Sequence, residues 1–104
     1  MTRCGLHSII IVMIKSFKHK GLELFYYTGN KKGINPNHYR KVARILDRLD
    51  ASKNPKDMNL PGYNLHPLIG KEKGIWSVWV SGNRRITFQF EEDDVILVNY
   101  FDYH

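Results

Sequence analysis

The chain has very little cysteine: Cys4 is the only one among its 104 residues. A lone cysteine cannot close an intrachain disulfide, which excludes the disulfide-rich folds of small secreted domains. No pair of cysteines or histidines shows the spacing of a zinc site either. We therefore expect a protein of the reducing cytoplasm whose chemistry needs no metal or other cofactor.

Long apolar runs are missing as well. The longest, Ile9 to Ile14, has six residues, whereas a helix needs about 20 to cross a bilayer. Arg3 precedes the run as in a signal peptide, but Lys15 and Lys18 follow it without a small-residue cleavage site. The run therefore predicts a buried β-strand, from about Ile9 to Phe17, and no membrane partner.

Positive charge, by contrast, is in excess. Sixteen Lys and Arg against ten Asp and Glu give a formal net charge of +6, and the isoelectric point is near 9.6. Such a balance favours a polyanionic partner, and RNA, DNA or an acidic protein would each satisfy it. Because the sequence shows no linker, repeat or low-complexity tract, its 104 residues are expected to form one small domain.

Hydrophobic periodicity predicts two helices in the first half of the chain. The shorter spans Gly21 to Thr28 and ends at Gly29, a residue typical of helix C-caps. The longer begins at Asn35, a capping residue that is followed by proline at the first helical position. Its apolar stripe has helical spacing and consists of Tyr39, Val42, Ala43, Leu46 and Leu49.

The second half of the chain is predicted to be β-structure. A loop from Asn54 to Gly62 is followed by a short strand-like segment, Tyr63 to Leu68. Three antiparallel strands joined by short turns come next, at Ile75 to Ser81, Arg85 to Glu91 and Val95 to Tyr100. Helices first and an antiparallel meander afterwards predict the α+β class.

Side-chain alternation predicts how the first two strands of this meander pair. A two-residue turn at Gly82-Asn83 would pair Val80 with Arg85 and mix core with charge. A three-residue loop that ends at Arg84 pairs Ser81 with Arg85 instead, and it aligns the apolar residues of both strands. We therefore expect Arg84 in the loop and Arg85 on the wetter, concave face of the sheet, together with Ser77, Thr87 and Gln89.

The pairing of the last strand has two solutions. A four-residue acidic turn would place Arg85 opposite Tyr100 and on the same face as Asp102 and His104. A loop of odd length would place Tyr103 on that face, and a bulge near the chain end would allow both. In every case the polar C-terminal residues lie one strand away from Arg85.

Several short motifs, taken together, resemble one family of toxins. They are the run from Met13 to Leu22, Leu65-His66-Pro67-Leu68, Gly74, Trp76-Ser77, Arg85-Ile86-Thr87-Phe88 and the ending Asp102-Tyr103-His104. From about Met13 to its end the chain closely resembles the HigB branch of the RelE/ParE superfamily. The resemblance implies two N-terminal helices packed on a curved, mainly antiparallel β-sheet. It also implies that residues 13–104 are the toxin domain and residues 1–12 an N-terminal extension.

The resemblance further implies a function. Its members are toxins of type II toxin–antitoxin pairs, endoribonucleases that cleave mRNA on the translating ribosome without a metal ion. A helix-turn-helix antitoxin of the HigA type would hold the toxin inactive. The complex would bind operator DNA and repress its own operon, and the toxin would reach DNA only through that complex.

The chemistry of such cleavage matches the residues at hand. A 2′-hydroxyl attacks its own phosphate, which requires a base, a cation for the developing charge and an acid for the 5′-oxygen. Imidazole is the side-chain group suited to either proton role near neutral pH, which makes His66 and His104 candidates, while the Arg85 guanidinium matches phosphate oxygens. Tyr103 would position a base, and Asp102 would orient an imidazole. By motif these five residues match the family's functional positions and form the predicted catalytic set.

One position departs from the family pattern. Relatives commonly carry lysine directly after His-Pro-Leu, where this chain has Ile69. Either Lys71 or Lys73 supplies that charge from the same loop, or the enzyme is slower. With Arg84 and Trp79 these lysines are the predicted RNA-binding residues, although Trp79 has two interpretations, a stacking platform for a base or a cross-strand packing residue.

Two other classes of function stay open. A non-catalytic ParE-like toxin would bind a protein target such as DNA gyrase, and an RNA-binding module would hold RNA without cleaving it. The site residues also have plainer interpretations, with His66 as a structural histidine in a His-Pro turn and Arg85 and Asp102 as a surface ion pair. No role is assigned to His7, His19 and His38.

Overall fold

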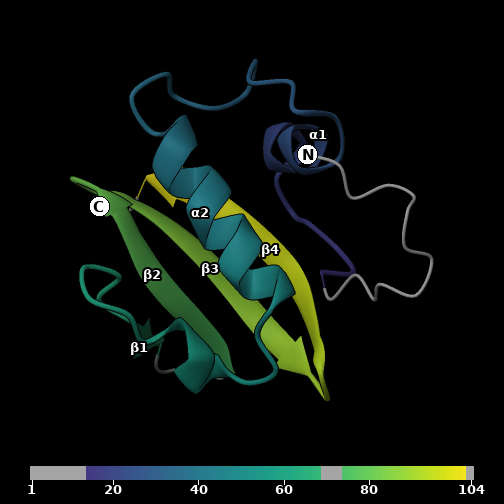
Figure 1. The fold of residues 1–104 in the computed structure, drawn as a ribbon, viewed down its shortest axis with the longest axis vertical. Helices are drawn as coiled ribbons and strands as arrows, with labels where there is room; N and C mark the ends of the chain where they lie inside the picture. Colours follow the sequence, from purple (N-terminus) through teal and green to yellow (C-terminus); the bar gives the residue numbers. More distant parts are fainter. Residues whose placement is uncertain (1–13, 69–73, 103–104) are drawn as a thin grey trace.

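The computed structural model describes residues 14–68 and 74–102, the last two by their backbone alone. In chain order the elements are α1 (Lys20–Thr28), α2 (Tyr39–Asp50), the 3₁₀ helix η1 (Pro55–Met58), β1 (His66–Pro67), β2 (Ile75–Ser81), β3 (Arg84–Glu91) and β4 (Asp94–Asp102). The strands form an antiparallel sheet in the order β1-β2-β3-β4 (Figure 1). The predicted α+β fold is confirmed, while the extension expected at residues 1–12 lies outside the described residues.

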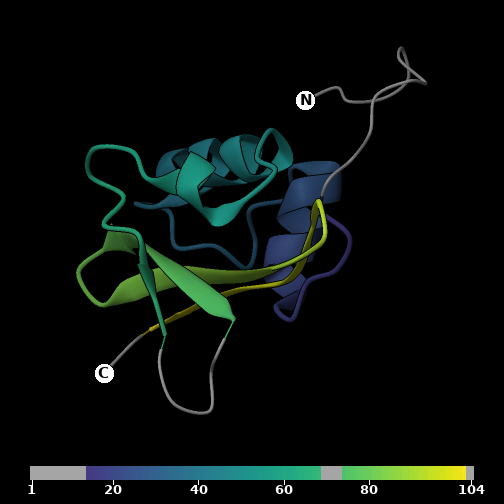
Figure 2. The same ribbon diagram turned by 90° about the horizontal axis from the view of Figure 1, so that it is seen from below.

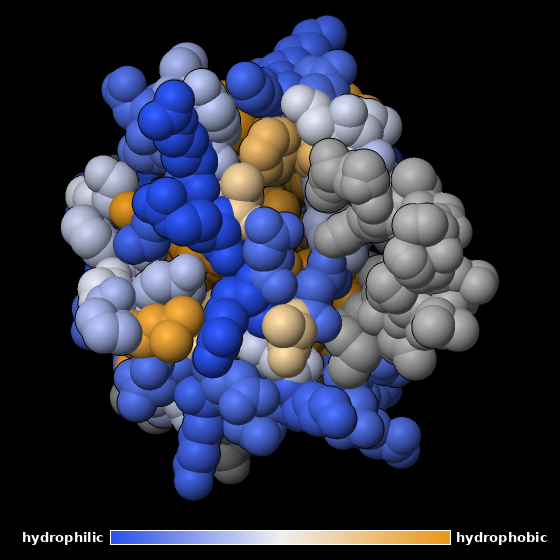
Figure 3. All heavy atoms as spheres, viewed as in Figure 1, coloured by the Kyte–Doolittle hydropathy of each residue, from blue (hydrophilic) through white to orange (hydrophobic). Residues whose placement is uncertain are grey.

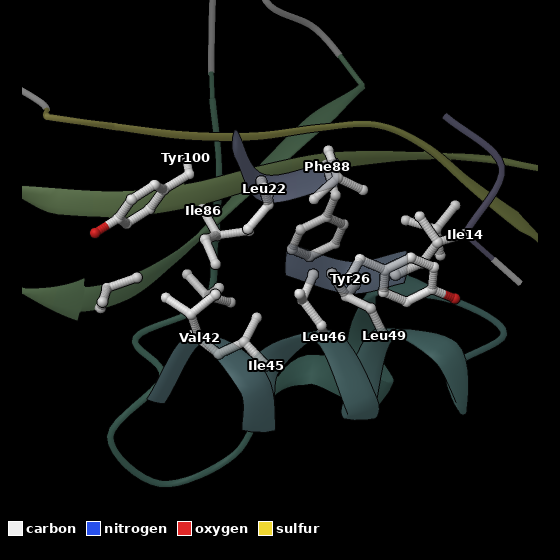
Figure 4. Packing of buried hydrophobic residues seen from close by; sticks show 14 of the residues in the cluster. Ile14, Leu22, Tyr26, Val42, Ile45, Leu46, Leu49, Ile86, Phe88 and Tyr100 are labelled. Atoms are coloured by element: carbon white, nitrogen blue, oxygen red, sulfur yellow. The ribbon is translucent and has the colours of Figure 1, made fainter. Parts of the chain in front are cut away.

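The helices cover one face of the sheet. Figures 1 and 2 show α2 lying across that face and α1 beside it, near β4. The buried side of α2 meets Ile86 and Phe88 of β3, and Leu22 and Tyr26 of α1 complete the core (Figure 4). Hydrophilic residues cover most of the outward side of α2 (Figure 3). Within the described ranges, no helix is long and apolar enough to span a bilayer.

Both ends of α1 follow from its flanking residues. His19 is the N-cap, and its Nδ1 accepts a hydrogen bond from the backbone N–H of Leu22 at 2.9 Å. Gly29 closes the helix in the left-handed region, at φ 81°, and its N–H donates to the carbonyl of Phe25. The predicted helix is confirmed, and it begins one residue earlier than expected.

The predicted start of α2 is wrong by three residues. Asn35 uses its side chain in a turn, where its Oδ1 accepts from the N–H of Asn37 at 2.9 Å, and the helix begins only at Tyr39. An asparagine followed by proline initiates turns as readily as helices, which is why the cap signal misled. The apolar stripe itself is confirmed, since Val42, Leu46 and Leu49 are buried, and Ile45 joins them.

The segment before α1 runs along the outer edge of β4. Isolated parallel bridges join Ile14 to Val95 and Phe17 to Val98, and the N–H groups of Lys15 and Lys18 donate to β4 carbonyls at 2.7 and 2.8 Å. The strand predicted from Ile9 to Phe17 is therefore a pair of bridges in its described part, and residues 9–13 lie outside that part. β4 consequently has backbone partners on both sides.

The predicted strand boundaries hold more closely than the predicted loops. The loop expected at 54–62 contains η1, which Asn54 caps by accepting from the N–H of Lys56. In the segment expected from Tyr63 to Leu68, only His66 and Pro67 are strand. β2 has the predicted bounds, whereas β3 begins one residue earlier and β4 extends further at both ends.

The β2–β3 register corrects the predicted loop. The turn has two residues, so Ser81 pairs with Arg84, and a bulge at Val80 then pairs Trp79 with Arg85. The expected pair of Ser81 with Arg85 is wrong, and Arg84 is the first residue of β3 rather than a loop residue. Because the extra residue restores the alternation, Val78 pairs with Ile86, and the apolar sets share a face as predicted.

A second bulge sets the register of β4. Glu91 pairs with Asp94 across a two-residue turn, and the ladder shifts by one residue between Thr87 and Gln89. The extra residue lies on β4, where Leu97 has a positive φ of 54°. At the turn the register is the one expected for the four-residue turn, because Phe90 pairs with Val95. The bulge then shifts the ladder by one residue, so Arg85 faces Phe101 instead of Tyr100.

Candidate active site

His66 stands on the short edge strand β1. It pairs with Ser77 of β2, and its Nδ1 lies 3.0 Å from the carbonyl oxygen of Asn64. Because a carbonyl oxygen can only accept, Nδ1 carries a proton in this bond, and in the neutral ring Nε2 keeps the lone pair. The half-buried ring is thus held by one nitrogen while the other is left for proton transfer.

Register places Arg85 on the same face of the sheet as His66. Ser77 pairs with both His66 and Thr87, and Thr87 lies two residues from Arg85 on β3. Paired residues and alternate residues of a strand share a face, which here is the face opposite α2. β1 and β3 are two strand spacings apart, roughly 10 Å, a gap that the long arginine side chain can reduce.

The middle of this face is less exposed to solvent than predicted. Ser77 and Thr87 are only 2% and 5% exposed, whereas His66, Arg85 and Gln89 are half-buried. The short side chains of Ser77 and Thr87 are shielded by the longer side chains around them. Solvent therefore reaches the larger polar groups that surround these two residues. The predicted grouping of Arg85 with Ser77, Thr87 and Gln89 on one face is nevertheless confirmed.

In its described part, the end of β4 lies one strand away from Arg85, as expected. The backbone of Asp102 pairs with Arg84, and that of Phe101 pairs with Arg85. Tyr103 and His104 lie outside the described residues, as do Ile69, Lys71 and Lys73, so their predicted roles stay predictions.

Arg84 and Trp79 take positions that alternation alone did not reveal. The guanidinium carbon of Arg84 lies 5.4 Å from the ring centre of Tyr100, a buried residue of the core. The indole N–H of Trp79 donates to the carbonyl of Gly82 at 2.9 Å, and Nζ of Lys41 lies 5.3 Å from a Trp79 ring centre. These contacts favour the packing interpretation of Trp79 and separate Arg84 from the face that carries His66.

Comparison with known proteins gives the family. A family model described as RelE-like toxin of type II toxin-antitoxin system HigB matches residues 15–104. The chain belongs to this family. It is 42% identical over 92 residues to a Proteus vulgaris protein named Endoribonuclease HigB, which covers 88% of this chain and all of that protein. It is also 35% identical over 81 residues to an uncharacterized protein of Haemophilus influenzae, covering 76% of this chain and 80% of that protein.

In this HigB-like toxin, sequence reasoning missed a second polar cluster on the helix side of the sheet. His38 precedes α2, and its Nδ1 lies 3.0 Å from the Tyr100 hydroxyl. The ring of His19, which precedes α1, lies 5.5 Å from the Tyr100 ring. The one available signal was that each histidine stands directly before a helix. Their shared contact with Tyr100 depends on tertiary packing.

The electrostatics of this cluster follow from burial and from Arg84. Burial lowers the pKa of His38 below its ordinary value of 6.5, and the Arg84 charge lowers it further. Burial is also the main cause of the lowered pKa of His19, where the Arg84 charge adds to the effect and a backbone hydrogen bond opposes it. Both rings are therefore neutral at pH 7.

Proposed function

We propose that the chain is the toxin of a type II toxin–antitoxin module and acts as a metal-independent endoribonuclease on translated mRNA. Family membership and the relative named an endoribonuclease support this activity. The observation that carries it is the placement of His66 and Arg85 on one open face, with the backbone of β4 paired to Arg85 at Phe101 and to Arg84 at Asp102. The net charge of +6 suits an RNA substrate within the ribosome.

The proposed chemistry is acid–base cleavage through the 2′-hydroxyl. Nε2 of His66 takes or gives a proton, because its Nδ1 is occupied by the Asn64 carbonyl. Arg85 stabilises the charge that develops on the phosphorane oxygens. His104 supplies the complementary proton transfer, Asp102 orients an imidazole, and Tyr103 positions a base.

The proposed partners are those of a toxin–antitoxin operon in the cytoplasm. A helix-turn-helix antitoxin of the HigA type inhibits the toxin, and the complex, rather than the toxin alone, binds operator DNA. A small helix-turn-helix reading frame next to this gene would support the pairing. Co-expression and co-purification of its product with the toxin would test it directly.

Primer extension on a message translated in a cell-free extract tests the activity. We expect the parent protein to cut within the translated region and to leave the same RNA intact without ribosomes. His66→Ala, and a chain that lacks residues 102–104, should each cut at least about 100-fold more slowly. Asn59→Ala, which alters an exposed residue at the end of η1, serves as the matched control.

The opposite results are equally clear. Equal cutting by the parent and by folded His66→Ala protein would exclude the proposed chemistry. Inhibition of DNA gyrase supercoiling without any RNA cleavage would identify a ParE-like binder. RNA binding without turnover in the translating extract would identify a plain RNA-binding module.

A further inference from the structure

A hollow lies on the same open face as His66 and Arg85, beside them. Its volume is about 120 Å³. The described residues in its walls include Lys18, Ile75, Thr87, Gln89, Leu97 and Asn99. A cavity of about 150 Å³ accommodates benzene, so this open hollow has room for the edge of an aromatic ring. Of the predicted site residues that the structure describes, none lines it.

The sheet register fixes where the hollow lies relative to the site. His66, Ser77, Thr87 and Asn99 form one row across the strands. Arg85 lies in the next row on one side, and Gln89, paired with Ile75, lies in the next row on the other. One row is two residues along a strand, about 7 Å, which is of the order of one nucleotide step. A chain of RNA cut at the central row would therefore place a neighbouring nucleotide at the hollow.

The polar groups of the hollow are available for a ligand. Among the described residues, no hydrogen bond engages the half-buried Gln89 amide or the Thr87 hydroxyl. The Oδ1 of Asn99 accepts from the N–H of Tyr100 at 3.0 Å, which leaves its amide N–H₂ to donate. Primary amides carry a donor and an acceptor side by side, the pattern that reads the edge of a base.

The backbone at the hollow is held in an unusual conformation. Leu97 has φ 54°, is 40% exposed, and stands in the bulge of β4. Its N–H donates to the Ser16 hydroxyl at 2.9 Å, which ties the bulge to the segment before α1. A non-glycine residue pays a conformational cost for positive φ, and bulges re-aim side chains near functional sites. Here the bulge presents a leucine to the hollow.

We infer that this hollow is a subsite for one nucleobase of the substrate RNA, next to the scissile phosphate. Ile75 and Leu97 provide apolar contact for the base, and the amides of Gln89 and Asn99 read its edge. A phosphate would require several cations, whereas Lys18 is the one cation among the described residues that line this wall. Lys18 therefore interacts with the sugar–phosphate backbone of the nucleotide whose base the subsite binds. The inference rests on the proposed ribonuclease function and adds the subsite that gives it base preference.

Cleavage of messages that differ only in the bases flanking the cut tests the subsite. We expect Gln89→Leu to keep a measurable cleavage rate but to change the relative rates for the four bases at one flanking position by about fivefold or more. Asn99→Leu should affect the same position. Asn59→Leu, which removes an exposed amide outside the hollow, should leave the base profile unchanged.

A second variant and a direct binding measurement distinguish loss of the subsite from misfolding of a variant. Gln89→Glu keeps the size of the side chain and replaces its donor with an acceptor, so it should alter the profile in a different way from Gln89→Leu. The side-chain amide NMR signals of Gln89 and Asn99 in the His66→Ala protein should shift when single nucleoside monophosphates are added.

The outcomes separate the two proposals. If the parent cuts RNA, and folded Gln89→Leu and Gln89→Glu cut with the parent's base profile, the subsite is refuted and the ribonuclease function stands. If the parent cuts no RNA under translation, the proposed function fails and the subsite fails with it.

Discussion

The imidazole Nδ1 of His38 lies 3.0 Å from the phenol oxygen of Tyr100, joining the start of α2 to the strand that leads to Asp102. The Tyr100 ring is 2% exposed, with Arg84 and His19 against it. Neutral His38 accepts the phenol proton at Nδ1 when its own proton is on Nε2. The last strand is thus fixed to both helices two residues before the candidate catalytic aspartate.

Acidification should weaken the fold through His19 and His38. Both bind a proton more weakly in the folded state than in the unfolded chain, where the pKa is about 6.5. Above pH 6.5 both states are neutral and this effect vanishes. As the pH falls below 6.5 the unfolded chain takes up protons first, so stability decreases.

Urea denaturation at pH 7.5, 6.5 and 5.5 measures this dependence. The double variant His19→Asn, His38→Asn removes both titrating groups, and asparagine retains N-capping ability. It should lose less stability than the parent between pH 6.5 and 5.5. An identical loss in both proteins would assign the acid sensitivity to other groups.

Tyr100→Phe should cost about 1 kcal/mol of unfolding free energy, because it removes the hydrogen bond to His38 and keeps the ring. Thermal or urea unfolding measures the loss. Tyr27→Phe is the matched control, since Tyr27 is 58% exposed, and it should be nearly neutral. With His38→Ala as background the Tyr100 substitution should cost less, and full additivity would show that the two side chains do not interact.

Gly33→Ala should destabilise the protein by about 1–3 kcal/mol. A Cβ at Gly33 would lie 2.7 Å from the Cα of Gly21, so backbone would meet backbone where the loop crosses the start of α1. Neither side can rotate away. Lys32→Ala changes an exposed neighbour and should leave the unfolding midpoint near that of the parent; a neutral Gly33→Ala would show that the crossing is loose.

Arg85→Lys should slow RNA cleavage by at least about tenfold with little change in unfolding midpoint. Lysine keeps the charge but loses the planar fork that engages two phosphate oxygens at once. Single-turnover cleavage rates in the translating extract measure the effect. Arg40→Lys, on the exposed side of α2, is the matched control, and equal rates for Arg85→Lys and the parent would remove Arg85 from the catalytic set.

Local signals in the sequence predicted the elements well. Gly29 marked the end of α1, and the alternation around Val78 and Phe88 gave the strands and their inward faces, because these depend on neighbouring residues alone. The prediction of where α2 starts was wrong because Asn35 can locally form either a helix cap or a turn. Which of the two forms depends on packing.

Features that depend on several elements were beyond sequence reasoning. The hairpin at Gly82-Asn83 combines a short turn with a bulge, and alternation cannot distinguish that from a longer turn without one. Arg85 was nevertheless predicted on the face of Ser77 and Thr87, since either solution keeps its parity, whereas the pairing of His66 with Ser77 was not predicted. The contact of Tyr100 with His38 and the hollow beside Gln89 arise from packing and register, and no short motif encodes them.

The bulge at Val80 also determines where the β2–β3 hairpin can gain or lose a residue among members of this family. Without Val80, a regular hairpin with the same two-residue turn would pair Ser81 with Arg84 and Trp79 with Arg85, as the present strands do. A one-residue deletion there would leave every other side chain on its face and remove one core valine that is 4% exposed. One residue inserted or lost farther along β2 would instead reverse the faces of the strand. Homologous hairpins are therefore expected to vary in length at Val80 and to stay constant between Ile75 and Val78.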